Sequence, residues 1–204
     1  MSGARRPVLL VATANADKLA EFRRLLPSDV DLIDLRDVGA SLPPEDGMTY
    51  AENADVKAIA AASQSGLLAL GDDSGLEVDA LGGRPGIFSA RFAGPERDDE
   101  ANRALLLAKM NDIPAAERTA RFVCALALAS PAGIVARVVG TCEGTIATKA
   151  SGKNGFGYDP LFRLPGGHTL AELSAEEKDL VSHRGNAVRA LLPLLRWELG
   201  RSAR

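Results

Sequence analysis

The sequence has no long apolar segment, no strong excess of one charge and no paired-cysteine motif. No apolar run approaches the ~20 residues of a membrane-spanning helix, so we expect no membrane span. The net charge is -3 with both signs interspersed, which leaves no basic face to hold a nucleic-acid duplex. The basic N-terminus leads into a short apolar stretch that suits a strand better than a signal peptide. We therefore expect a cytoplasmic protein that binds neither membrane nor nucleic acid.

Cysteine is scarce: Cys124 and Cys142 each lie in strand-like sequence. Neither belongs to a CxxC motif or has a histidine nearby, which argues against a zinc site. We expect two small buried thiols in a reduced cytosol, with a disulfide between them as the open alternative. Internal repeats, low-complexity segments and linkers are also missing from the sequence.

What is present is enough apolar sequence for one sizeable core, since 46% of the 204 residues are hydrophobic. This length favours one domain, residues 1–204, with two lobes. Strand and helix patterns alternate early, while strand pairs dominate later. That order is typical of an α/β (mixed α+β) protein, in which a long central mixed sheet has flanking helices.

The stretch Gly71–Gly94 holds the densest group of polar and turn-forming residues. The apolar run Leu67–Leu70 leads into Asp72 and Asp73, as in a buried strand that ends in acidic residues at a cleft. Adjacent carboxylates repel each other unless positive charge lies beside them, and an oxygen-seeking metal such as Mg²⁺ supplies it. The alternative is an acidic turn, continued by Ser74-Gly75, that only reverses the chain.

The first segments predict a strand, a short polar loop and a helix. Val8–Ala12 is a continuous apolar run expected to be a central strand, and Asn15 is a suitable N-cap for the helix. Lys18 lies in the first helical turn, where the helix dipole disfavours a cation unless a phosphate docks there. A docked phosphate would reverse that penalty, but for these residues taken alone a capped surface helix with a solvated lysine is the favoured interpretation.

A second helix is predicted after the loop that carries Glu45. Thr49–Glu52 matches a capping box, and the helix should run to about Ser65. Asn53 and Lys57 lie one turn apart and can share a face. For that pair taken alone, a solvated polar stripe is the favoured interpretation.

The remaining periodic segments predict a strand, a hairpin and several helical segments. They are a strand at Val30–Leu35, a helix at Asp98–Met110, hairpin strands at Thr119–Ser130 and Gly133–Thr148, a helical turn at Leu170–Leu173, a second capping box at Ser174–Glu177 and a last helix from Ser182 or His183.

A glycine-rich, basic loop covers residues 149–157. It fails the nucleotide-binding P-loop pattern, because Ala147 stands where the first glycine is needed and no Ser or Thr follows Lys153. The next motif, Phe156–Pro160, offers two aromatic rings and a carboxylate. This combination suits stacking on a flat heterocycle and suits a packed turn equally well. The start of the last helix, at His183-Arg184, offers an anion or carbonyl site.

These segments, in this order, resemble the inosine triphosphate pyrophosphatase family, whose members hydrolyse deaminated purine nucleoside triphosphates. The likeness covers about Val8 to Leu195, and Ala14 departs from it where many relatives carry glycine. The matching motifs are Thr13-x-Asn15-x-x-Lys18 with Glu21, Glu52-Asn53 with Lys57, Asp72-Asp73-Ser74-Gly75-Leu76, Pro85-Gly86 with Ser89-Ala90-Arg91, Phe156-Gly157-Tyr158-Asp159-Pro160, and Glu177-Lys178 followed by Ser182-His183-Arg184.

The resemblance implies both a fold and a division of roles. The sheet would form the floor of a substrate cleft between two lobes, usually in a homodimer. Glu45 and Asp73 would hold Mg²⁺ with Asp72 close by, and Asp73 would also orient or deprotonate the attacking water. The substrate would be bound by Thr13, Asn15, Lys18 and Lys57 at the triphosphate, by Ser74, Phe156, Gly157, Tyr158 and Asp159 along the nucleotide, and by Lys178, His183 and Arg184 at the purine.

The implied activity is Mg²⁺-dependent hydrolysis of ITP, dITP and XTP to the monophosphate and pyrophosphate, which cleanses the nucleotide pool. Water would attack between the α- and β-phosphates, where Mg²⁺, Lys18 and Lys57 neutralise about four negative charges. Donors at the purine would favour a 6-oxo group and oppose the amino group of adenine. Two alternatives remain: a pyrophosphatase for another altered nucleotide, such as a modified pyrimidine, and a non-enzymatic nucleotide sensor.

Overall fold

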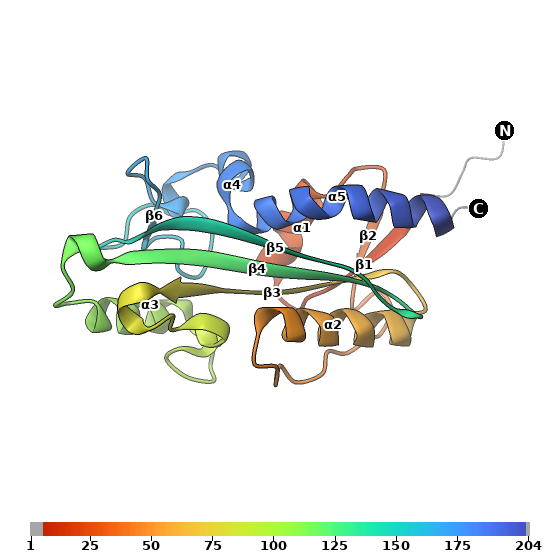
Figure 1. Cartoon of the computed structure of the whole chain (residues 1–204), viewed down its shortest axis with the longest axis horizontal. Coiled ribbons are helices and arrows are strands. Elements are labelled where there is room, and N and C mark those ends of the chain that lie inside the picture. Colours follow the sequence, from red (N-terminus) through yellow and green to blue (C-terminus); the bar gives the residue numbers. More distant parts are fainter. Residues whose placement is uncertain (1–5, 203–204) are drawn as a thin grey trace. The chain divides into compact units, whose positions relative to one another are not determined.

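The computed structural model describes residues 6–202, which form a mixed six-stranded sheet with flanking helices (Figure 1). This confirms the predicted fold class. The strands pair in the order β2-β1-β3-β4-β5-β6. They are β1 (Val8–Ala12), β2 (Asp31–Asp34), β3 (Ala69–Val78), β4 (Thr119–Ser130), β5 (Gly133–Ile146) and β6 (Phe162–Arg163). The α-helices are α1 (Ala16–Leu25), α2 (Tyr50–Ser65), α3 (Asp99–Lys109), α4 (Ala175–Val181) and α5 (His183–Ser202).

The chain divides into two compact units. Unit 1 holds the residues up to Asp73, Ala125–Val139 and the residues from Ala187 onward, while unit 2 holds Ser74–Cys124 and Gly140–Asn186. Strands β3, β4 and β5 and helix α5 each contribute residues to both units. The single two-lobed domain and its substrate cleft stay predictions.

Unit 1 is built around β1, which pairs in parallel with β2 on one side and with β3 on the other. Helix α1 connects β1 to β2 on one side, and α2 then connects β2 back past β1 to β3 on the other side. Right-handed crossovers in opposite directions place the two helices on opposite faces of the sheet. Open parallel sheets bind ligands beyond the carboxyl ends of their strands, which is where the loop from β1 to α1 begins.

The helix starts in both units use the caps expected from the sequence. The Asn15 side chain accepts a hydrogen bond from the Lys18 backbone N–H at 3.0 Å, and the Thr49 hydroxyl accepts one from the Glu52 N–H at 3.1 Å. In unit 2, α4 begins with the predicted capping box, Ser174–Glu177. Each cap satisfies N–H groups that a helix start otherwise leaves unpaired.

Helix α2 approaches β3 closely because both elements carry small residues where they meet. The side chains of Ala54, Ala58, Ala61 and Ala62 are all buried. Gly71 of β3 faces this row, and a Cβ atom placed on it would lie 2.1 Å from the Ala54 carbonyl oxygen. The close approach brings Asn53 and Lys57 of α2 within hydrogen-bond distance of Asp73, two residues after Gly71 in β3.

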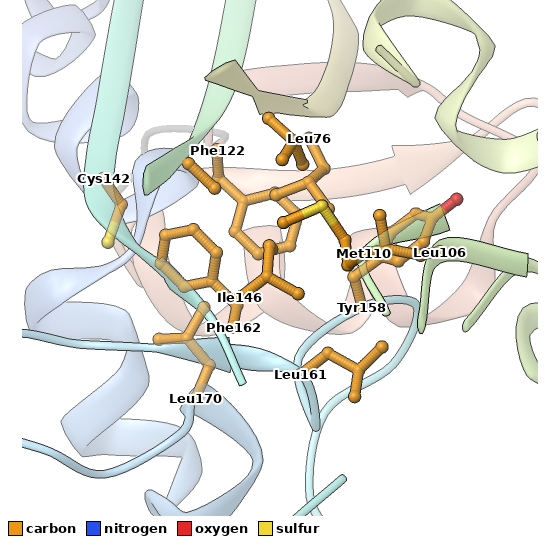
Figure 2. Packing of buried hydrophobic residues seen from close by; sticks show 12 residues of the cluster. Leu76, Leu106, Met110, Phe122, Cys142, Ile146, Tyr158, Leu161, Phe162 and Leu170 are labelled. Atoms are coloured by element: carbon orange, nitrogen blue, oxygen red, sulfur yellow. The ribbon is translucent and has the colours of Figure 1, made fainter. Parts of the chain in front are cut away.

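The core of unit 2 gathers apolar side chains from its strands, from α3 and from the loop before β6 (Figure 2). Figure 2 shows Tyr158 among them, and only 4% of its surface is exposed. The cluster contains Leu76, Val78, Leu106, Met110, Ala120, Phe122, Cys142, Ile146, Tyr158, Leu161, Phe162 and Leu170.

The prediction that a strand ends at the acidic pair is wrong, and so is the Ser-Gly turn after it. Strand β3 continues through Asp72, Asp73 and Ser74 as far as Val78. Polar side chains are tolerated within a strand when each has a partner for its charge or hydrogen bonds.

The structure also tests the predictions about a disulfide and about a membrane span. Cys124 and Cys142 are buried and are not joined in a disulfide, so the open alternative of a disulfide is wrong. Burial, then the nearby Glu143 and Asp159 charges, raise the pKa of the Cys142 thiol to about 11. Within residues 6–202, none of the helices has the length and apolar character that crossing a membrane requires.

Candidate active site

Two aspartates side by side in β3 form the centre of the candidate site in unit 1. Consecutive residues of a strand point to opposite faces, and each carboxylate contacts its own lysine. Asp72 accepts a hydrogen bond from the Lys18 ammonium, and Asp73 Oδ1 accepts one from Lys57 Nζ at 3.3 Å. The positive charge that adjacent carboxylates require is therefore supplied by a lysine on each side.

Lys57 joins two carboxylates that are far apart in sequence. Its ammonium donates to Glu45 Oε1 at 2.7 Å and to Asp73 Oδ1 at 3.3 Å. Burial lowers the pKa of Lys57, but Asp73, Asp72 and Glu45 together outweigh that effect and raise it. Lys57 is therefore charged at neutral pH, and it holds together the two acids expected to bind the metal.

Asn53 fixes the orientation of Asp73. Its Nδ2 donates to Asp73 Oδ2 at 3.0 Å, while its Oδ1 accepts from the Gly47 N–H at 2.9 Å. The interpretation of Asn53 and Lys57 as a solvated stripe is wrong, because only 2% and 4% of their surfaces are exposed. The loop that carries Glu45 packs over this face of α2 and buries both side chains. The residue pattern of the helix alone does not show that a distant loop covers it.

Burial raises the pKa of the Asp73 carboxyl above its ordinary value. Lys57, Lys18 and the hydrogen bond from Asn53 oppose this shift, Asp72 adds to it, and the net direction is upward. A carboxylate with a raised pKa accepts a proton from water more readily than an exposed one. The environment of Asp73 therefore suits a general base.

The loop between β1 and α1 lies next to this group. Ala12 pairs with Gly71 in the parallel ladder, so the loop starts beside the acidic pair. The Thr13 hydroxyl accepts a hydrogen bond from the Asn15 N–H at 3.2 Å, which gives the loop a defined shape before the helix begins. Residues 14–17 are exposed, so the positive end of the α1 dipole is open to an anion.

The donor set in unit 1 fits Mg²⁺ that is shared with a substrate. Magnesium usually takes one or two protein carboxylates and fills its other positions with water and phosphate oxygens. Glu45 and Asp73 provide such a pair through their contact with Lys57. Among residues 6–202 no group of three or more His, Cys, Asp or Glu side chains is arranged to hold an ion. The described residues thus lack an all-protein cage.

Unit 2 brings together the three residues expected to read the purine. Lys178, His183 and Arg184 are all buried, although two carry formal charge. Arg184 Nη2 donates to Ser74 Oγ at 2.8 Å, which ties the last helix to the residue after the acidic pair. The His183 ring stacks on Phe122, with centroids 4.7 Å apart and planes inclined by 13°.

Phe156 carries two cations near its ring. Lys178 Nζ lies 4.8 Å from the ring centroid, and the guanidinium carbon of Arg184 lies 6.0 Å from it. Both distances fall within the range of cation–π attraction. The Phe156 residue is only half-buried, so this group combines donors with an aromatic surface that is partly open.

The other residues of the Phe156–Asp159 motif are engaged within unit 2. The Tyr158 hydroxyl donates to the Ser89 carbonyl at 2.9 Å, and burial raises the pKa of this phenol. Asp159 Oδ2 accepts from the Lys178 ammonium and from the Phe156 N–H at 2.9 Å. These contacts shape the loop, whereas Phe156 keeps exposed surface for a ligand.

The predicted site residues thus fall into two sets, one in each unit. Unit 1 holds Thr13, Asn15, Lys18, Glu45, Lys57 and Asp73, and unit 2 holds Ser74, Phe156, Gly157, Tyr158, Asp159, Lys178, His183 and Arg184. The roles assigned to these residues stay predictions.

The family model described as the Ham1 family matches residues 9–194. The chain belongs to the Ham1 family. A dITP/XTP pyrophosphatase of Exiguobacterium sibiricum is 50% identical over 195 residues, which cover 94% of this chain and 98% of that protein. The predicted resemblance is confirmed.

Solved structures agree with the Ham1 assignment. A HAM1 protein from Coxiella burnetii has a TM-score of 0.85 at 38% identity, and the match covers 93% of this chain and 98% of that one. A nucleoside-triphosphatase / dITP/XTP pyrophosphatase from Mycobacterium abscessus has a TM-score of 0.73 at 49% identity, with coverage of 92% and 99%.

Several residues of this Ham1-family chain contact the predicted site residues and were given no role by the sequence. Among them are Asn53, which orients Asp73, and the α3 residues Asp99 and Arg103, which both contact Gly157. The spacing of Asp99 and Arg103, four residues apart at the start of a predicted helix, was the available signal. It places them on one face but does not name what that face contacts.

Proposed function

We propose that this chain is a dITP/XTP pyrophosphatase that hydrolyses ITP, dITP and XTP to the monophosphate and pyrophosphate. The single observation that carries the proposal is the pair of lysine-bound aspartates in β3, beside the carboxyl end of β1. Relatives that are 50% and 54% identical over at least 90% of this chain bear the name dITP/XTP pyrophosphatase.

The triphosphate would bind to unit 1 by exchanging partners with the carboxylates. Lys18 and Lys57 are bound to Asp72, Glu45 and Asp73, so three carboxylates against two ammonium groups leave one net negative charge. A triphosphate carries about four negative charges and would draw both lysines away from these acids. Thr13, Asn15 and the start of α1 would hold other phosphate oxygens.

The exchange frees Glu45 and Asp73 to act as metal ligands. When bound there, Mg²⁺ would neutralise phosphate charge and lower the pKa of a coordinated water. Asp73 would orient the attacking water and accept its proton, as its raised pKa favours. Asn53 would keep the carboxylate turned correctly through its hydrogen bond to Oδ2.

The purine would be read by unit 2. Lys178 and Arg184 are donors without acceptor capacity, and His183 provides a further ring N–H. A 6-oxo group accepts from such donors, whereas the amino group of adenine opposes them. A buried contact between two opposed donors would favour the 6-oxo purine over adenine on the order of a hundred-fold or more. Phe156 would stack on the flat base.

A homodimer and a cytoplasmic location belong to the same proposal. Val56 and Ile59 of α2 are 42% and 45% exposed, and a second copy of the chain would cover such apolar surface. Two buried cysteines that form no disulfide agree with a reduced compartment. Sedimentation equilibrium should give twice the chain mass, and a monomer at micromolar concentration would contradict the dimer.

The test is pyrophosphate release from dITP, XTP, ITP, dGTP, dATP and a modified pyrimidine triphosphate, each with Mg²⁺ or with a chelator. We expect fast Mg²⁺-dependent release from the first three and at least about hundred-fold slower release from dATP. Preference for the modified pyrimidine would favour the alternative pyrophosphatase. Binding of dITP without turnover would favour a nucleotide sensor.

A further inference from the structure

Helix α3 binds both the N–H and the carbonyl of Gly157, which lies between Phe156 and Tyr158 in a loop of unit 2. The Gly157 N–H donates to Asp99 Oδ2 at 2.7 Å, and Arg103 Nη1 donates to the Gly157 carbonyl at 2.8 Å. Asp99 and Arg103 lie four residues apart, so their side chains project from the same face of the helix. We refer to this pair of contacts as the α3 clamp.

The loop needs such a clamp because its backbone is intrinsically permissive. Gly152, Gly155 and Gly157 all have positive φ, a conformation that glycine adopts without strain but also leaves readily. Ordering each such residue costs backbone conformational entropy. Two hydrogen bonds from a regular helix, one of them from a guanidinium, offset part of that cost at Gly157.

The clamp acts on the residue next to Phe156. On the other side, the Phe156 N–H is held by Asp159, which Lys178 also contacts. The ring of Phe156 is thus placed by backbone contacts at residues 156 and 157, while its face remains within 4.8 Å of the Lys178 ammonium. A binding group must be held within about 0.5 Å of its productive position, so a shift of the loop by about 1 Å would misplace the Phe156 ring.

Asp99 is not needed to start its own helix. The N-cap of α3 is Asp98, whose Oδ1 accepts from the Glu100 and Ala101 N–H groups at 2.8 and 3.0 Å. Asp99 is exposed, and its carboxylate accepts a hydrogen bond from the Gly157 N–H. Capping therefore does not explain this residue, whereas contact with the loop does.

We infer that Asp99 and Arg103 are positioning residues for base recognition, which set the selectivity for oxo-purines by fixing Phe156. This inference rests on the proposed function, in which Phe156 stacks on the purine. Neither residue touches the base. Their loss should weaken binding of the nucleoside part of a substrate and leave binding of the phosphate chain unchanged.

The experiment compares Asp99→Ala and Arg103→Met with wild type and with Glu100→Ala. Glu100 is an exposed acid in the same helical turn, and it contacts the N-cap Asp98 through its backbone N–H. Kinetics are measured with dITP, and inorganic tripolyphosphate serves as a base-free competitive inhibitor. We expect the KM for dITP to rise about ten-fold in both clamp variants, with kcat within about three-fold of wild type.

Further readouts separate a positioning role from general loss of structure. The inhibition constant of tripolyphosphate and the Tm should stay near wild type in the clamp variants, and Glu100→Ala should match wild type throughout. Asp99→Asn keeps an oxygen that accepts the Gly157 N–H, so it should restore most of the affinity for dITP. The preference for dITP over dATP should shrink in Asp99→Ala and Arg103→Met.

An unchanged KM for dITP in both clamp variants would overturn the inference. An equal rise in KM and in the tripolyphosphate inhibition constant would also overturn it, because that result reports general loss of structure. Wild-type protein that fails to turn over dITP would refute the proposed function and the clamp with it. Turnover by wild type with unaffected clamp variants would refute the clamp alone.

Discussion

Replacing Asp73 by asparagine should remove most turnover while leaving the fold as stable as before. The change abolishes the carboxylate that accepts from Lys57 at 3.3 Å, but Lys57 keeps its closer contact with Glu45 at 2.7 Å. The new amide retains an oxygen that can accept from Asn53, which now donates at 3.0 Å. The hydrogen-bond inventory of the folded protein is therefore nearly preserved.

Removing the buried negative charge of Asp73 partly compensates for the lost ion pair with Lys57. Burial raises the pKa of Asp73 above 3.8, so the folded state prefers the neutral form of this side chain. The stability gained from that preference is present below the unfolded pKa and is lost as pH rises through the folded pKa. A neutral amide avoids this loss, so the variant should gain on wild type as pH rises from 4 to 7.

These terms nearly cancel, and the net change in unfolding free energy at pH 7 should be within about 1 kcal/mol. For a chain of this length that corresponds to a Tm within about 4 °C of wild type. Loss of a general base alone typically costs about 10²–10⁴-fold in rate. The variant should therefore release pyrophosphate from dITP at least about a hundred-fold more slowly.

The assay combines pyrophosphate release with thermal melts at pH 4 and pH 7. Asp55→Asn is the matched control, because Asp55 is an acid of α2 whose carboxylate contacts Arg137 at the surface. That variant should retain full turnover. The reasoning fails if Asp73→Asn turns over dITP near the wild-type rate, or if its Tm falls by more than about 10 °C.

Three further predictions concern the backbone and a thiol. Gly71→Ala should lower the unfolding free energy by more than about 2 kcal/mol and reduce turnover, because the new Cβ would lie 2.1 Å from the α2 backbone; urea unfolding that matches wild type would contradict this. Gly155→Ala should raise the KM for dITP more than Gly157→Ala does, since both positions have positive φ but only the former Cβ would collide with Asp159, at 2.1 Å; equal KM values would count against it. Cys142, with its pKa raised to about 11, should resist iodoacetamide in the native protein at pH 8 and react after denaturation; rapid native labelling traced to it by mass spectrometry would be inconsistent.

Local signals in the sequence were sufficient for the helix starts. The caps at Asn15 and Thr49 depend on hydrogen bonds to residues three positions away, so both partners lie within one short stretch of sequence. The apolar run at Val8–Ala12 likewise became a central strand, because strand pairing on both sides requires apolar side chains on both faces.

Long-range contacts explain what the sequence pattern missed. The extent of β3 through Asp72 and Asp73 depends on lysines from α1 and α2, and the latter lies 16 residues away from Asp73 in the chain. Asp99 and Arg103 contact Gly157 across 58 and 54 residues. Periodicity places such side chains on a face, but only the folded chain identifies the partner.

The central claim is that Lys18, Lys57 and the carboxylates they contact form an active site. In that site oxo-purine triphosphates would be hydrolysed between the α- and β-phosphates. The most direct measurement is to identify the products formed from dITP and Mg²⁺ by ³¹P nuclear magnetic resonance. We predict deoxyinosine monophosphate and pyrophosphate in equal amounts. Deoxyinosine diphosphate with orthophosphate, or unchanged dITP, would contradict the claim.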